Sequence, residues 1–202
     1  MCWNEEVSLN TFIFGIVSAA IVLAINKNEF SNVLFLLSVT FMQLIEYFAW
    51  RNIHNKEAIK FISICGMVLI LLQLIILNTF NLQGNERIII LIILFITSLL
   101  ALIHIVKNNK LQMNKAINGH LAWHWVDLPI PLLIVLLSLY LYSAIRNKEI
   151  IILFLIIILL SISLFSYYKY KTWGSMWCYI SNIFWLVLIA KVIYEHLNIF
   201  KK

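Results

Sequence analysis

The sequence predicts an all-α fold, a polytopic transmembrane helical bundle of about seven helices. Hydrophobic residues occupy 63% of the 202 positions and charged residues only 12%, and the mean hydropathy is +0.95. A soluble domain is about half apolar and about a quarter charged. A water-soluble fold of this length could not bury so much apolar surface. We therefore expect lipid to surround a single transmembrane domain that covers residues 1–202.

Short polar joints divide the chain into apolar segments that are long enough to cross a bilayer. A hydrocarbon core about 30 Å thick needs roughly 20 mainly apolar residues in helical form. The alternation of a β-barrel is absent, and helices satisfy their own backbone groups within the segment. The predicted spans are 9–26, 30–50, 58–80, 87–106, 128–146, 149–168 and 173–194.

Each span is bounded by recognisable residues. The first follows an acidic segment that includes Glu5 and Glu6, whereas a cleaved signal peptide opens with a basic region, so we expect no cleaved signal. Polar joints at 26–29, 51–57, 81–87 and 146–149 separate the next spans, and 167–171 precedes the last. Pro129 suits the first turn of the fifth span.

Seven spans would place the N-terminus and the joints after spans two, four and six on one face of the membrane. Lys and Arg are slightly more numerous on that face, which favours a cytoplasmic N-terminus. The net charge of +6 is spread singly over the joints, so we expect the bilayer as partner and no nucleic acid. A lipid or small-molecule ligand is a further expected partner. The oligomeric state is not predicted.

Glu46 is the first candidate functional residue, because it lies inside the second span. Gln43, Glu46 and Tyr47 are three or four residues apart and share one side of a helix. A carboxylate within hydrocarbon is costly unless it is paired or neutralised. Glu46 is therefore either a functional group or a hydrogen-bonded link between helices.

The segment Gly119-His120-Leu-Ala-Trp-His124-Trp-Val-Asp127 is the second candidate. His120, His124 and Asp127 have the spacing i, i+4 and i+7, which predicts a short interfacial helix with all three on one face. Two histidines and an aspartate are suitable zinc ligands. The alternative is that these histidines bind water or headgroups beside Trp123 and Trp125, since tryptophan collects at membrane interfaces.

Two further features lie in the last span. Gly174, Ser175, Cys178, Ser181 and Asn182 are small or polar residues at helical spacing, which favours close helix packing over a nucleophilic role for Cys178. Lys191 is a candidate retinal attachment site, but the sequence offers no carboxylate at a comparable depth, and a lysine near the end of a span can extend to the headgroups.

Short motifs carry two resemblances. Met-Cys-Trp at residues 1–3, Gln43-x-x-Glu46-Tyr47, His120-Leu-Ala-Trp123 and Gly174-Ser-Met-Trp-Cys178 together resemble an uncharacterised family of small polytopic membrane proteins that begin Met-Cys-Trp. That family occurs in large DNA viruses and some bacteria and has no assigned activity. The abundance of Ile, Asn and Lys fits the AT-rich genome of such a virus.

The run His120-Leu-Ala-Trp-His124 is similar to the His-Ala-x-Trp-His run of the seven-helix superfamily that contains the alkaline ceramidases and GPI-lipid remodelling proteins. The resemblance implies that His120 and His124 hold zinc in a lipid amide or ester hydrolase. This chain departs from the superfamily, since it lacks an earlier Ser-x-x-x-His element and its histidines precede the fifth span.

The first functional hypothesis is a non-enzymatic binding or assembly component with a polar cluster on the N-terminal side. The alternative is a zinc-dependent intramembrane lipid hydrolase. There, a metal on His120, His124 and Asp127 would lower the pKa of a bound water, with Glu46 or His104 carrying the proton. A channel or transporter that depends on Glu46 and a retinal protein that uses Lys191 are lesser alternatives.

Overall fold

The computed structural model describes residues 4–148 and 150–199, and most of them are helical. Six helical stretches are long and apolar enough to cross a membrane, and a shorter apolar helix lies at Ile130–Arg146. The predicted all-α bundle is confirmed. The elements are α1 (Glu5–Ile25), η1 (Lys27–Glu29), α2 (Phe30–Arg51), α3 (Lys56–Asn81), α4 (Gly84–Lys107), β1 (Met113–Lys115), β2 (Leu121–Trp123), η2 (His124–Val126), α5 (Ile130–Arg146), α6 (Ile150–Tyr167), η3 (Tyr168–Tyr170), α7 (Trp173–Ile180) and α8 (Ile183–Ile199).

Asparagines that precede two of the helices cap their first turns. The Val7 N–H donates to Asn4 Oδ1 (2.9 Å) at the start of α1, and the Ala58 N–H donates to Asn55 Oδ1 (3.1 Å) at the start of α3. The first N–H groups of a helix have no partner within it, and such a cap contributes about 1 kcal/mol. Polar residues next to the apolar spans therefore also stabilise the helix ends.

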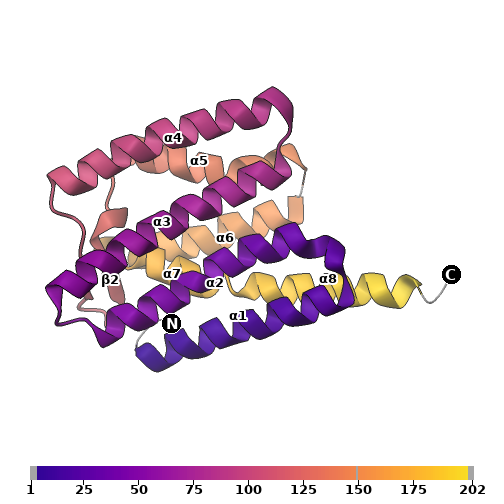
Figure 1. Ribbon diagram of the computed structural model, residues 1–202, viewed down its shortest axis with the longest axis horizontal. Coiled ribbons are helices and arrows are strands. Elements are labelled where there is room, and N and C mark those ends of the chain that lie inside the picture. The colour runs from indigo at the N-terminus through magenta and orange to yellow at the C-terminus, as the bar shows by residue number, and fades with distance from the viewer. Residues whose placement is uncertain (1–3, 149, 200–202) are drawn as a thin grey trace.

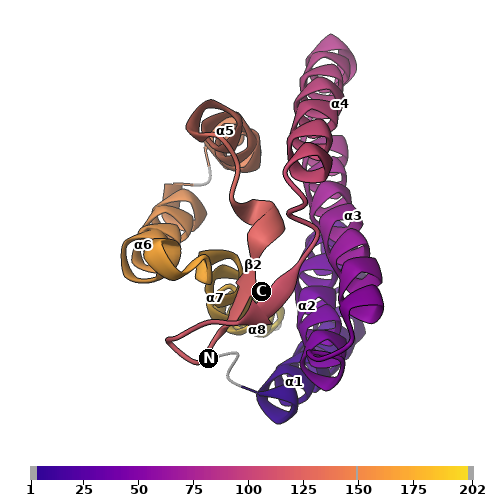
Figure 2. The ribbon, with the colours of Figure 1, turned by 90° about the vertical axis from the view of Figure 1, so that its left-hand side faces the viewer.

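The helices run back and forth along the long axis of the molecule (Figure 1). The ends of α2, α4 and α6 lie at the same end of the bundle as the start of α1, as predicted, and α8 ends at the other end. We call the first of these ends, with residues 51–55, 108–129 and 167–172, the N-terminal face. Viewed from that end, α1 to α4 form one row, and α5 to α7 lie opposite with the strands between them (Figure 2).

The predicted interfacial helix around His120–Asp127 is wrong. β1 and β2 pair antiparallel, with Met113 opposite Trp123. The strands are joined by a tight loop in which Gly119 has φ +81, a conformation that glycine adopts without strain. An Asn-Gly pair between two short strands is a strong hairpin signal, and Asn118-Gly119 provides it here.

A small polar junction links α1, α2 and α8 within the apolar bundle. Trp185 Nε1 donates to Thr40 Oγ1 (2.9 Å), and a Cβ built at Gly15 would lie 2.5 Å from the same oxygen. The last span is interrupted beside this junction at Ser181 and Asn182, between α7 and α8. Both residues are buried, and irregular backbone at membrane depth is tolerated where protein covers it.

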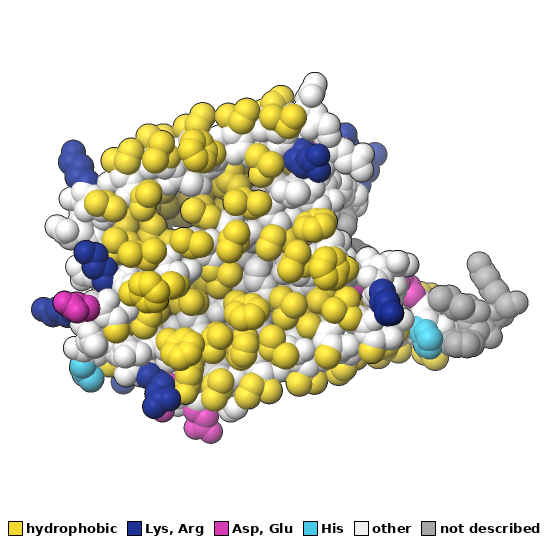
Figure 3. Space-filling model, viewed as in Figure 1, with side chains coloured by type: hydrophobic (Ala, Val, Ile, Leu, Met, Phe, Trp, Pro, Cys, Tyr) yellow, Lys and Arg dark blue, Asp and Glu magenta, His cyan; other side chains and the backbone are white. Residues whose placement is uncertain are grey.

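Apolar side chains cover most of the face of the bundle that Figure 3 shows. Phe61 is 67% exposed and Phe95 is 70% exposed. Continuous apolar surface of this extent marks contact with a membrane or another protein, and six helices meet the requirement for crossing a bilayer. The structure therefore agrees with an integral membrane protein.

Gly15→Ala is expected to lower the melting temperature of the detergent-solubilised protein. The added Cβ would displace Thr40 and weaken its hydrogen bond with Trp185, and such overpacking costs about 1–3 kcal/mol. Thr40→Ala removes the opposing atoms, so Gly15→Ala should cost much less in that background. Ala20→Val, on the exposed side of α1, is the matched control. Equal losses in both backgrounds would contradict this contact.

Candidate functional site

The hairpin closes the N-terminal face by placing its second strand inside the bundle. All three residues of β2 are buried. The Trp123 N–H donates to Lys171 O (3.1 Å), and Asn118 Nδ2 donates to Thr172 Oγ1 (2.9 Å). The strand and its loop are thus both fastened to the joint between α6 and α7.

Two tryptophans form an apolar wall behind the hairpin. The Trp123 and Trp125 rings stack with centroids 4.9 Å apart and an interplanar angle of 10°. A Cβ built at Gly174 would lie 2.8 Å from Trp123 Cε3, so only glycine permits this approach of α7. Among the described residues, neither indole N–H has a hydrogen-bond acceptor.

The three predicted metal ligands, His120, His124 and Asp127, contact different partners. They do not share a helical face, because His120 precedes β2 and His124 begins η2. In the part of the chain that the structure describes, no three His, Cys, Asp or Glu residues are grouped to hold a metal ion. Tyr167 contacts His120, Asn114 bonds to His124, and Lys110 and Lys171 pair with Asp127.

Asp127 is the centre of a charged network on the N-terminal face. Its Oδ2 lies 2.8 Å from Lys171 Nζ and 3.1 Å from Lys110 Nζ. Lys110 Nζ also lies 3.2 Å from Nε2 of His104. Partial burial opposes ionisation of Asp127, but hydrogen bonds from Lys171 and Lys110, together with their charges, outweigh it and hold the pKa of the carboxyl below its usual value.

Burial lowers the pKa of both hairpin histidines. The shift of His120 comes chiefly from loss of solvent. Burial also lowers the pKa of His124, the charge of Lys171 lowers it further, and Asp127 opposes this change. Both rings are therefore neutral at neutral pH.

The two predicted proton carriers, Glu46 and His104, lie on different helices, α2 and α4. Glu46 is fully buried on α2, on the helix face that also buries Met42 and Ala49. That face packs against α7. His104 lies in the last turn of α4 and contacts Lys110 and Asn108. Glu46 thus lies among the helices, whereas His104 belongs to the Asp127 network.

Lys191 has a carboxylate neighbour that sequence reasoning missed. Its Nζ lies 2.7 Å from Glu29 Oε1, and Asn32 Nδ2 donates to the other oxygen of Glu29 (2.6 Å). Glu29 lies at the joint between the first two spans, at the same end of the bundle as Lys191. The prediction that no carboxylate lies at a depth comparable to that of Lys191 is therefore wrong. The pairing depends on the packing of α8 beside the start of α2, which the sequence does not reveal.

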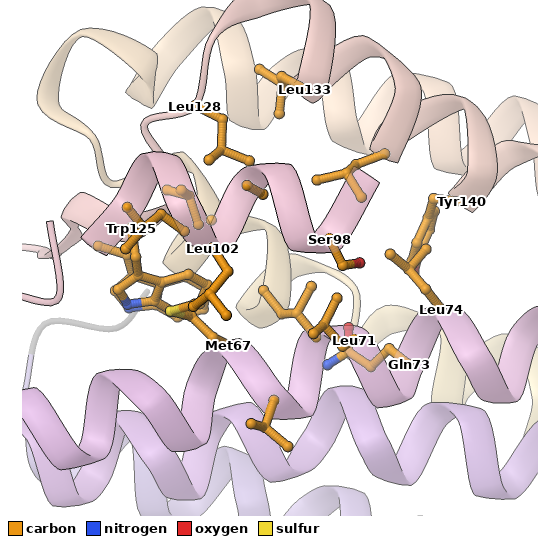
Figure 4. Close-up of a pocket in the computed structure, with 18 of the residues that line it drawn as sticks. Met67, Leu71, Gln73, Leu74, Ser98, Leu102, Trp125, Leu128, Leu133 and Tyr140 are labelled. Atoms are coloured by element: carbon orange, nitrogen blue, oxygen red, sulfur yellow. The ribbon is translucent and has the colours of Figure 1, made fainter. Parts of the chain in front are cut away.

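A cavity of about 570 Å³ lies between the two rows of helices. α3 and α4 bound one side, and α5, α7 and residues 121–128 bound the other (Figure 4). The exposed side chains of Val68 on α3 and Phe95 on α4 lie at its margin, and the surface is hollowed between these helices (Figure 3). Its lining is almost entirely apolar and includes Met67, Leu71, Ser98, Leu102, Leu133 and Tyr140.

A second, smaller pocket of about 150 Å³ lies at the N-terminal face. It is charged, since Asp127, Lys169 and Lys171 line it. Val126 and Trp173 line both this pocket and the large cavity, so the apolar and charged spaces adjoin.

No protein-family model, curated protein or solved structure matches this chain. The two resemblances therefore stay predictions, and the Met-Cys-Trp opening of one lies outside the described residues.

Sequence reasoning missed the cavity because its walls come from distant segments. The Asn118-Gly119 pair was the available signal for the hairpin that carries Trp123 and Trp125. Nothing local indicates that these rings meet α7, since that contact depends on the arrangement of the two helix rows.

Acidification from about pH 7.5 to about pH 5.5 should lower the melting temperature. Folding lowers the pKa values of His120 and His124 from the ordinary value of 6.5. Below about pH 6.5 the unfolded chain therefore binds more protons than the folded protein, and the free energy of unfolding decreases as the pH decreases. His124→Gln should reduce this dependence, and His54→Gln, in the α2–α3 joint, should preserve it. Equal pH dependence in wild type and His124→Gln would contradict this role.

Proposed function

We propose that this integral membrane protein binds the hydrocarbon chain of a lipid in the cavity between its two rows of helices. The observation that carries the proposal is the cavity itself. Its volume of about 570 Å³ falls within the range of roughly 300–1,000 Å³ that is typical of small-molecule sites. Its lining suits hydrocarbon and offers little to a polar ligand.

Access to the cavity also favours a lipid. The exposed lining residues lie on α3 and α4, helices that are long and apolar enough to cross the membrane. In a bilayer these side chains would contact lipid acyl chains. An acyl chain could therefore move laterally from the membrane into the cavity. A water-soluble ligand would have to cross hydrocarbon to enter between these helices.

The zinc-dependent hydrolase would require His120, His124 and Asp127 to move together from their present partners. Stoichiometric zinc in the purified protein that is lost on combined His120→Ala and His124→Ala substitution would favour the hydrolase over the binding role. Zinc that is absent, or retained in that variant, would oppose it.

Ser98→Trp is expected to reduce the lipid that co-purifies with the protein, because the indole would occupy the cavity beside Leu71 and Tyr140. Native mass spectrometry of the detergent-purified chain measures the bound lipid. Ile96→Trp adds the same ring to α4 at an exposed position outside the cavity lining and should retain the lipid. Equal retention by the two variants would contradict the proposal.

A further inference from the structure

The charged pocket at the N-terminal face adjoins the apolar cavity. Val126 and Trp173 contribute to the walls of both spaces. A molecule with one apolar part and one polar part could therefore occupy them together. The pocket volume of about 150 Å³ suits a small headgroup.

The charge of this pocket favours an anion. Lys169 and Lys171 line it together with Asp127, and Lys110 lies against the same aspartate. Asp127 thus balances one of three lysine charges. Within the described part of the chain, Lys169 has no ion-pair partner, and its side chain is exposed. Lysines near the membrane surface attract anionic headgroups, and phosphate is a strong acceptor for their N–H groups.

The depth of the cavity matches one leaflet of a bilayer. Along α4 the lining extends from Val106, beside the N-terminal face, to Phe95. At 1.5 Å per residue this stretch rises about 16 Å, roughly half of a hydrocarbon core about 30 Å thick. A lipid of the leaflet at the N-terminal face could hold its chain along α4 and its headgroup beside Lys169.

We infer that the ligand is an anionic phospholipid from this leaflet, with its phosphate beside Lys169 and Lys171 and an acyl chain in the cavity. This inference rests on the proposed lipid-binding function and adds the headgroup class. A neutral lipid would offer Lys169 no anionic partner. A free phosphate would leave the cavity unused.

The test compares two probes with the same chains, dioleoylphosphatidylglycerol and dioleoylglycerol, added at equal concentration to the full-length protein in a non-ionic detergent. Native mass spectrometry gives the bound fraction of each. We expect the wild type to retain the phospholipid preferentially. Lys169→Gln should weaken phospholipid binding about fivefold and leave dioleoylglycerol unchanged. Lys56→Gln is the matched control, since Lys56 is exposed on the same face and outside the pocket lining.

The outcomes separate the headgroup inference from the proposed function. Equal affinity for the two probes, or equal phospholipid binding by Lys169→Gln and Lys56→Gln, would overturn the anionic headgroup while lipid binding remains. Failure of Ser98→Trp to reduce either probe would overturn the cavity proposal itself. Glycerol phosphate, which has no chains, should compete only weakly, and competition as strong as that of the phospholipid would overturn a continuous site.

Discussion

The contact between Trp123 and Gly174 holds the hairpin inside the bundle. A side chain at Gly174 would collide with the indole, because its Cβ would lie 2.8 Å from Trp123 Cε3. The close approach brings the Trp123 N–H within 3.1 Å of Lys171 O. Lys171 in turn reaches Asp127. The absence of a side chain at Gly174 therefore determines both the wall of the cavity and the positions of the charged residues beside it.

Hydrophobic burial alone does not organise such a bundle, since lipid tails are as apolar as the helix surfaces. Polar contacts and small residues provide the specific pairings. Thr40 accepts from Trp185 across α2 and α8, and Gly15 brings α1 to the same point. Lys191 and Glu29 link α8 to the start of α2 near the opposite face. These links hold α1, α2 and α8 together, whereas α3, α4, α5 and α7 form most of the cavity walls.

The spans could be predicted because each depends on local composition and length. The starts of α1 and α3 also depend on local residues, since Asn4 and Asn55 cap them. The metal set was predicted from helical spacing, and it depended on a helix that the Asn118-Gly119 turn replaces with a hairpin. The pairing of Lys191 with Glu29 joins residues 162 positions apart. Such contacts arise from packing, and a single sequence carries little trace of them.

Selectivity in the proposed site must come mainly from its polar end. Protein interiors are packed to the density of organic crystals, and side chains beside a void lose dispersion contacts. An acyl chain that fills the cavity restores these dispersion contacts, and any lipid tail of suitable length can do so. Contact with hydrocarbon therefore distinguishes poorly between lipids that share the same tails. Lys169 and Lys171 line the pocket that adjoins the cavity at Val126 and Trp173, so in the proposed site we expect the headgroup, and not the tail, to determine which lipid is preferred.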